Sequence, residues 1–167
     1  MLDEIKNKEQ YHFQIQDFII HKKFVLSSGE KLVNYLILNN QDELAIEFLK
    51  RLAIHDNSKL NKEEFILLCN IENKKNSFIN ANEVLDENLK KSIELHWKNN
   101  SHHPEHFQNA ENMSELDIME MCCDWHARSC QYNTDFLSFV KIRQENRFHF
   151  SDKMFEKIWN YCLILNN

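Results

Sequence analysis

The sequence predicts an all-α protein, a compact single-domain bundle of about seven or eight helices over residues 1–167. Three observations support this prediction. The chain of 167 residues contains one Gly and one Pro, so few turns can adopt the positive φ angles that β-sandwiches and barrels use repeatedly. Apolar residues recur three and four positions apart, which is the period of an α-helix. Ser, Thr and Asn residues that could cap helices stand before several of these stretches.

The N-terminal part is expected to form three consecutive helices. Apolar residues at helical spacing predict the first over residues 8–26. Ser27 and Glu30 are spaced as in a capping box, which predicts that a second helix begins there and continues through LVNYLIL. Asn40 and Glu43 offer a similar start for the third helix, QDELAIEFLKRLA, which runs into the segment HDNSKL.

The middle of the chain alternates helices with polar segments. Asn61 and Glu64 predict the start of a short helix, KEEFILLC. The polar residues 70–83 are expected to form a loop, and a longer helix is expected over residues 83–99. Residues 99–112, NNSHHPEHFQNAEN, contain the single Pro of the chain and predict a loop or a helix break.

The C-terminal part is expected to complete the core. Ser114 and Asp117 predict the start of the helix ELDIMEMCCDWHARSCQY. Thr134 and Ser151 can cap two further helices with apolar stripes. The helices of residues 134–167 should therefore close the hydrophobic core of the domain.

Composition narrows the class of protein. Hydrophobic residues form 43% of the chain, and no apolar run approaches the roughly 20 residues that span a bilayer, so no membrane partner is expected. The net charge of -6 argues against a general nucleic-acid-binding protein, which would normally be basic. The five cysteines form no CxxC pair and no signal peptide is recognised, so we expect reduced thiols and a cytoplasmic location.

The segment HDNSKL carries the first chemical signal. It places His55 and Asp56, two potential metal ligands, at a helix end where Gly or Asn and a basic residue are common. A purely structural role is also open for this pair. His55 could interact with the negative end of the helix dipole while Asp56 caps the following turn.

Further candidate ligands lie on separate predicted helices. The ordered set of candidate metal ligands is His21, His55, Asp56, His96, His102, His103 and Asp124. Because helical faces repeat every three or four residues, Asp117, Glu120 and Asp124 can share one face. Arg128 follows one turn later. Imidazole and carboxylate donors together suit one or two borderline divalent ions, namely Mn, Fe, Co, Ni or Zn.

The order H…HD…H…H…D resembles the signature of the HD-domain superfamily, the all-α metal-dependent phosphohydrolases. HDNSK is similar to the HDxxK often seen in that superfamily, with Lys59 at the matching place, and CCDW supplies the closing aspartate. More closely, HDNSK…EEF, HWKNNSHHPEHF and EMCCDW resemble a little-characterised branch of HD-like proteins from bacteria and phages. The resemblance covers roughly residues 15–130 and implies a helical bundle of the HD-domain type.

The resemblance also implies how the ligands are shared between two ions. The ligands of the first ion would be His21, His55, Asp56 and Asp124. Those of the second would be Asp56, His96 and a histidine of the 102–103 pair. The sequence leaves open which histidine of the HHPEH segment binds metal.

The function implied by the resemblance is hydrolysis of a small phosphate ester, with a nucleotide as the expected substrate. The metal ions would polarise a phosphoryl oxygen and lower the pKa of a bridging water. Lys59 and Arg128 are expected to hold the phosphate, Arg128 through its planar fork. His106 remains as a candidate to protonate the leaving oxygen.

Alternative functions are compatible with the same residues. Some relatives with the same ligand order use two irons and oxygen to oxidise a small substrate. A non-catalytic binding protein stabilised by metal would carry the same ligands. His96 could also simply pack beside Trp97, the HHPEH segment could be a solvated loop, and Lys59 and Arg128 could form only surface ion pairs.

Overall fold

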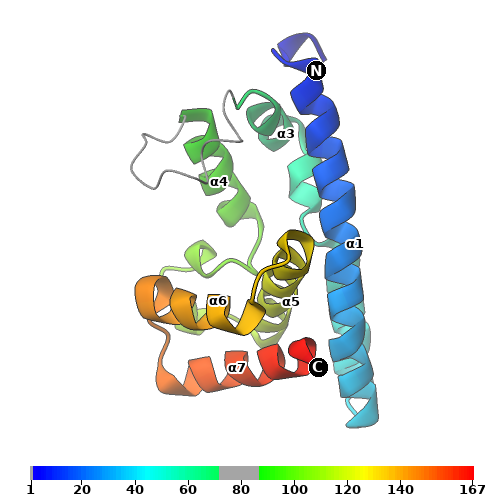
Figure 1. Ribbon diagram of the computed structural model, residues 1–167, viewed down its shortest axis with the longest axis vertical. Coiled ribbons are helices and arrows are strands. Elements are labelled where there is room, and N and C mark those ends of the chain that lie inside the picture. Colours follow the sequence, from blue (N-terminus) through cyan, green and yellow to red (C-terminus); the bar gives the residue numbers. More distant parts are fainter. Residues whose placement is uncertain (1, 72–86) are drawn as a thin grey trace. The chain divides into compact units, whose positions relative to one another are not determined.

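All regular secondary structure in the described part of the chain is helical. The computed structural model describes residues 2–71 and 87–167, and in these ranges it contains seven α-helices and no strand (Figure 1). The helices are α1 Lys8–Leu38, α2 Asp42–Ile54, α3 Lys62–Cys69, α4 Glu87–Asn99, α5 Glu115–Tyr132, α6 Phe136–Arg143 and α7 Asp152–Asn166. The all-α prediction is confirmed. Most of the loop predicted over residues 70–83, and the start of the helix predicted over residues 83–99, lie outside the described residues.

Short helical turns connect several of these helices. The described residues include four 3-10 turns, namely Leu2–Glu4 before α1, and Asn57–Leu60, Pro104–His106 and Ala110–Asn112 between helices. A π-helical turn, Gln144–Phe148, directly follows α6. Two of the 3-10 turns lie in HDNSKL and in the HHPEH segment, so each candidate ligand segment contains a tight helical turn.

The chain divides into two compact units, which are described separately. Unit 1 consists of Met1–Ile19 and Asp56–Asn100, and unit 2 consists of Ile20–His55 and Ser101–Asn167. Helix α1 contributes residues to both units. The chain passes from one unit to the other at three places, and each of the last two crossings lies next to a predicted ligand segment.

The core of unit 2 is built around α5. This helix packs against α2, α6 and α7, and α6 and α7 lie side by side (Figure 1). Phe48 of α2, Met119 of α5 and Ile158 of α7 are completely buried. Since burial of apolar surface is the main force that favours folding, this core fixes the faces that α2 and α5 turn towards each other.

Unit 1 has a smaller core between α3 and the start of the chain. Phe65 and Cys69 of α3 are buried together with Ile5. Tyr11 of α1 meets Phe65 edge to face, with ring centroids 5.3 Å apart. Helix α3 also packs against α4 and against the turn Asn57–Leu60, so the segment that follows Asp56 is held by this core.

The helix break predicted at Ser27 is wrong, because α1 continues without interruption from Lys8 to Leu38. Ser27 is exposed, whereas its neighbour Ser28 is buried. The Ser28 hydroxyl donates a hydrogen bond to the Phe24 carbonyl oxygen, 2.8 Å away. The hydroxyl of a serine that bonds back to the preceding turn has a hydrogen-bond partner inside the helix. The serine is therefore compatible with a continuous α1 and does not mark the start of a second helix.

Three predicted helix starts are confirmed. Ser114 and Asp117 form a reciprocal capping box at the start of α5. Ser151 caps α7 and accepts a hydrogen bond from the Met154 amide. Asn61 occupies the residue before α3, as predicted, although its side chain makes no capping hydrogen bond.

Two other helix starts are displaced by one residue. Helix α2 begins after Gln41 because Asn40 adopts a left-handed conformation with a φ of 57°, which Asn tolerates better than most residues. Helix α6 begins after Asp135 instead of Thr134, and the Asp135 carboxylate accepts a hydrogen bond from the Ser138 amide. A carboxylate at this position also interacts favourably with the positive end of the helix dipole.

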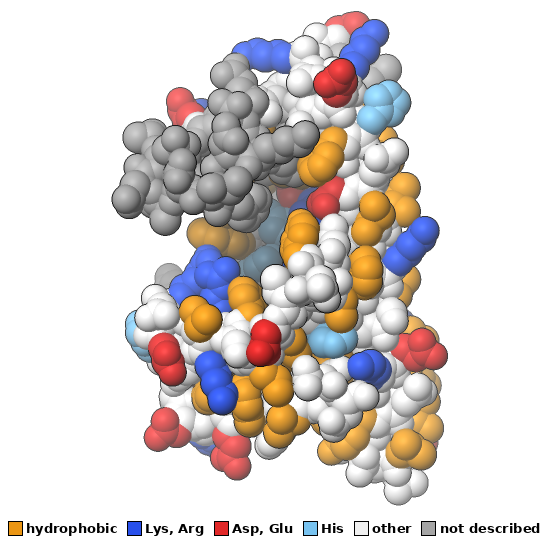
Figure 2. Space-filling view, viewed as in Figure 1, with side chains coloured by type: hydrophobic (Ala, Val, Ile, Leu, Met, Phe, Trp, Pro, Cys, Tyr) orange, Lys and Arg blue, Asp and Glu red, His pale blue; other side chains and the backbone are white. Residues whose placement is uncertain are grey.

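Hydrophobic side chains also reach the surface. Those exposed on α1 and α2 include Phe13, Ile20, Leu26, Ile46, Leu49 and Ile54. Figure 2 shows hydrophobic side chains, in orange, among polar ones on one face of the molecule. Exposed apolar side chains are common on folded proteins. Across the described ranges, no helix has the length and apolar character needed to cross a membrane.

Gly29 allows α1 to approach α2 closely. A Cβ atom at this position would overlap with Cδ1 of the buried Leu52 side chain and lie 2.9 Å from its Cδ2. We predict that Gly29→Ala lowers the free energy of unfolding by about 1–2 kcal/mol, because the forced repacking outweighs the better helix propensity of Ala. Urea unfolding followed by circular dichroism measures this change.

A Leu52→Ala background provides the control for this prediction. It removes the three side-chain atoms that the new Cβ would meet, so Gly29→Ala should be neutral or stabilising there. Equal destabilisation in both backgrounds would show that contact with Leu52 is not the cause.

Candidate metal centre

Three polar side chains of unit 2 converge from three helices. His21 lies on α1, His55 is the C-cap of α2, and Asp124 lies on α5. The two histidines are 2% and 1% exposed, and the Asp124 side chain is 14% exposed. These three residues are called the triad below. Polar groups are costly to bury unless they are paired or bind an ion, so the contacts within the triad show whether its side chains could bind an ion.

The triad presents three donor atoms to one point. Nε2 of His21 lies 2.8 Å from Oδ1 of Asp124 and 3.4 Å from Nε2 of His55. Nε2 of His55 lies 4.0 Å from the same Asp124 oxygen. A triangle with these sides has a circumradius of about 2.0 Å, close to the usual distance from zinc to imidazole nitrogen or carboxylate oxygen. One ion could therefore contact all three atoms with little movement of the side chains.

Glu120 lies on α5 one turn before Asp124 and contacts two histidines. Its Oε1 lies 2.8 Å from Nδ1 of His55 and 3.2 Å from Nδ1 of His102. The rings of these histidines have centroids 4.5 Å apart and planes tilted by 40°. Glu120, His55 and His102 are thus a second group of donor atoms in unit 2 that could hold an ion.

Arg51 binds the carboxylates of α5. Its guanidinium group donates to Oε2 of Glu120 and to Oδ1 of Asp117. It also donates to the Ser101 hydroxyl, which in turn donates to Asp117 over 2.6 Å. Arg51 precedes His55 by four residues on α2, the spacing that brings two side chains to one helix face. The polar face of α2 therefore meets the acidic face of α5.

The carboxylates of this site are held in their ionised form. Burial raises the pKa of Asp124, but the hydrogen bond to His21 and the charge of that ring outweigh burial and hold the pKa well below its usual range. Burial also raises the pKa of Glu120, and the hydrogen bonds to His102 and His55 lower that pKa by more. Both side chains are therefore anionic near neutral pH.

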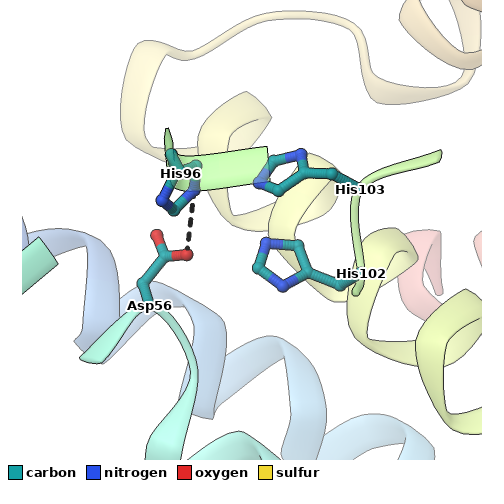
Figure 3. Close-up of side chains that lie close together, drawn as sticks. All are labelled: Asp56, His96, His102 and His103. Atoms are coloured by element: carbon teal, nitrogen blue, oxygen red, sulfur yellow. Dashed lines mark ion pairs between the residues drawn. The ribbon is translucent and has the colours of Figure 1, made fainter. Parts of the chain in front are cut away.

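Unit 1 contains its own polar cluster around Asp56 and His96. Oδ1 of Asp56 lies 3.3 Å from Nε2 of His96, the pair joined by the dashed line in Figure 3. Nδ1 of the same ring lies 2.8 Å from Oε1 of Glu64, which is completely buried. Burial lowers the pKa of His96, but the two carboxylates raise it by more. Lys59 donates to the other Asp56 oxygen over 2.6 Å, so the Asp56 carboxylate contacts both His96 and a lysine.

Asp56 has a left-handed backbone, with a φ of 58° and a ψ of 11°. This conformation is uncommon for residues other than Gly, although Asp and Asn tolerate it. The Asp56 side chain makes no capping hydrogen bond to the turn that follows. A role for Asp56 as a simple helix cap is therefore wrong, because its carboxylate is directed to Lys59 and His96 instead.

The other candidate residues lie in unit 2. The ring of His103 packs against that of His102, with centroids 4.2 Å apart (Figure 3). His103 is half-buried and His106 is exposed, so His102 is the most buried histidine of the HHPEH segment. Arg128 is half-buried and donates to Gln131 on its own helix over 3.0 Å.

The sequence contains only a weak signal for the residues that hold these ligands in place. Glu120 and Asp117 are recognisable as sharing a helix face with Asp124, but nothing in this spacing indicates that Glu120 contacts His55 and His102 or that Asp117 contacts Arg51. Glu64 is recognisable only as part of a helix start. Arg51 lies four residues before the HD pair, and this spacing is the signal that could have identified it.

The fold and the geometry together define an all-α protein in which buried histidines and carboxylates could hold a metal ion. The model of one family, described as "Family of unknown function (DUF5662)", matches residues 10–163. The chain therefore belongs to this family. No curated protein matches the chain, and no solved structure does.

We predict that Arg51→Met lowers the free energy of unfolding by about 3 kcal/mol, because it leaves two carboxylates of α5 without their cation. The measurement is urea unfolding at neutral pH. Lys50→Met is the matched control, since the neighbouring Lys50 side chain is 68% exposed and pairs only with Glu47 among the described ion pairs. An exposed pair of this kind contributes at most about 1 kcal/mol. Equal losses in the two variants would contradict the prediction.

Proposed function

We propose that this chain is a metal-dependent phosphohydrolase of the HD type, acting on a small phosphate ester, with a nucleotide as the first substrate class to test. The observation that carries the proposal is the triad. Two imidazole nitrogens and one carboxylate oxygen surround a point about 2.0 Å from each of them. This donor set suits Mn, Fe, Co, Ni or Zn.

The triad residues have distinct parts in holding an ion. His55 directs Nδ1 to the Glu120 carboxylate, which leaves Nε2 for the triad. Asp124 supplies the negative charge, and its ionised state is supported by His21. A divalent ion at this point would polarise a phosphoryl oxygen and make water more acidic, which is the chemistry that hydrolysis of a phosphate ester needs.

The remaining candidates would serve a second ion and the substrate. The proposed ligands of the second ion are Asp56, His96 and one of His102 and His103. Lys59 contacts the Asp56 carboxylate, so its ammonium group lies beside a proposed ligand and could also attract a phosphate oxygen. Arg128 is proposed as a second phosphate-binding residue, and His106 as the donor of a proton to the leaving oxygen.

The composition of the triad also favours a second candidate function. Two histidines and one carboxylate are the ligands of many non-haem iron enzymes that use oxygen. The chain would then oxidise a small substrate instead of hydrolysing one. Activity that requires both iron and oxygen would select this function, whereas hydrolysis without oxygen would select the first.

Metal analysis of protein purified without oxygen tests the proposed site. We expect at least one divalent ion per chain in the wild type and a clear loss of that ion in Asp124→Asn. His12→Ala is the control, because His12 is an exposed histidine of the same helix as His21. A triad variant that retains as much metal as the wild type would refute the site. A screen of phosphate esters, nucleotides first, then tests the reaction.

Chelation should lower the melting temperature of the protein, because an ion bound only by the folded state stabilises that state. The stabilisation is about 2.7 kcal/mol when the free ion is at 100 times its dissociation constant. Thermal unfolding before and after verified metal removal measures the change. An unchanged melting temperature would contradict a preformed site.

Asp56→Asn should reduce hydrolysis by orders of magnitude while the helices remain intact, because Asn keeps the left-handed backbone but loses the carboxylate charge. Turnover and circular dichroism are measured on the same sample. Lys62→Ala is the control, since Lys62 forms an exposed ion pair with Glu4 in the same unit. Near-normal turnover of the Asp56 variant would exclude the proposed role of this residue.

A further inference from the structure

The carboxylate of Glu120 faces two histidines and one arginine at the same time. One of its oxygens contacts Nδ1 of both His55 and His102, at 2.8 and 3.2 Å. Its other oxygen accepts from Arg51. Glu120 is 4% exposed, so these three partners, and not water, determine its orientation.

The direction of these hydrogen bonds fixes the proton of each ring. An ionised carboxylate can only accept hydrogen bonds, so each imidazole must donate through Nδ1–H. A neutral imidazole carries one proton, and its other nitrogen is then a lone-pair donor. His55 and His102 are both left with Nε2 as the atom that can bind a metal. For His55 this is the atom that belongs to the triad.

Further hydrogen bonds hold the acceptor in place. Arg51 binds Asp117 as well as Glu120, and Asp117 is fixed by the capping box with Ser114. Ser101 also donates to Asp117, and it is the residue before His102. The same network therefore orients the carboxylate and anchors the chain segment from which His102 projects.

We propose that Glu120, held by Arg51, is a positioning residue that imposes the Nδ1–H tautomer on His55 and His102 together, and so presents Nε2 of both to metal. This inference rests on the proposed metal centre for its purpose. It distinguishes His102 from the other histidines of the HHPEH segment, because His102 is the most buried of the three and its ring is oriented by a carboxylate of α5. Partners of this kind fix the orientation of a ligating histidine and increase its basicity.

Nitrogen NMR of metal-free protein labelled at its histidines tests the tautomers directly. Long-range couplings between ring protons and nitrogens distinguish Nδ1–H from Nε2–H, and single histidine replacements assign the signals. We expect Nδ1–H for His55 and His102 in the wild type. In Glu120→Gln one carboxylate oxygen becomes an amide donor, so at least one of the two rings should shift towards Nε2–H.

Metal affinity provides the second measurement. Competition with a chromogenic chelator should show a loss of about 10–100-fold for Glu120→Gln. Glu115→Gln is the matched control, because Glu115 lies on the same helix and accepts from Tyr161. Its substitution should change neither the tautomers nor the affinity. Arg51→Lys keeps the positive charge but lacks the planar fork, and it should shift both measurements in the same direction by a smaller amount.

The outcomes separate this inference from the proposed function. Unchanged tautomers and unchanged affinity in Glu120→Gln would overturn the inference, even if the protein binds metal. If the wild type shows Nδ1–H tautomers but binds no metal, the proposed function is wrong. The positioning of both rings by Glu120 would still be supported. Should Glu120→Gln fail to fold, the Arg51→Lys variant decides, and unchanged tautomers and affinity there would likewise overturn the inference.

Discussion

The ion pairs of Arg51 with Asp117 and Glu120 hold α2 against α5, and the arrangement of the candidate metal centre depends on them. Either carboxylate would be costly to bury without its cation, whereas the planar guanidinium group satisfies both. Because the arginine bridges two residues one turn apart on α5, it fixes the register of α2 along that helix. His55, one turn after Arg51, is thereby placed against Glu120. The site is thus a product of helix packing.

The third helix of the site is positioned mainly by hydrophobic contacts. His21 lies on the same buried stripe of α1 as Val25, Leu32 and Leu36, at the spacing of one helix face. The apolar members of the stripe pack into the core of unit 2. Because these apolar neighbours are buried, His21 at one end of the stripe is buried as well, and there it contacts Asp124. This placement requires the uninterrupted helix that the structure shows.

The sequence predicts helices well wherever a local contact decides them. The capping box at Ser114 is an example, because both partners lie within four residues of each other. The break predicted at Ser27 fails because the neighbouring hydroxyl bonds back into its own helix, a choice that the spacing of residues does not reveal. The triad is predictable as an ordered set of ligand types. The role of Glu120 is not, since its two partners at α2, Arg51 and His55, lie 69 and 65 residues away along the chain and pair with it only after α2 and α5 have packed.

The left-handed backbone at Asp56 limits how this position can change over evolutionary time. Most side chains are strained at a φ of 58°, whereas Gly, Asn and Asp adopt it readily. In the genetic code, Asn and Gly are each one nucleotide change away from Asp. A protein that loses the Asp56 carboxylate in evolution can therefore retain the turn through a single nucleotide change to Asn or to Gly. Most other replacements would first have to overcome a folding defect, so the turn itself narrows the routes by which the carboxylate can be lost.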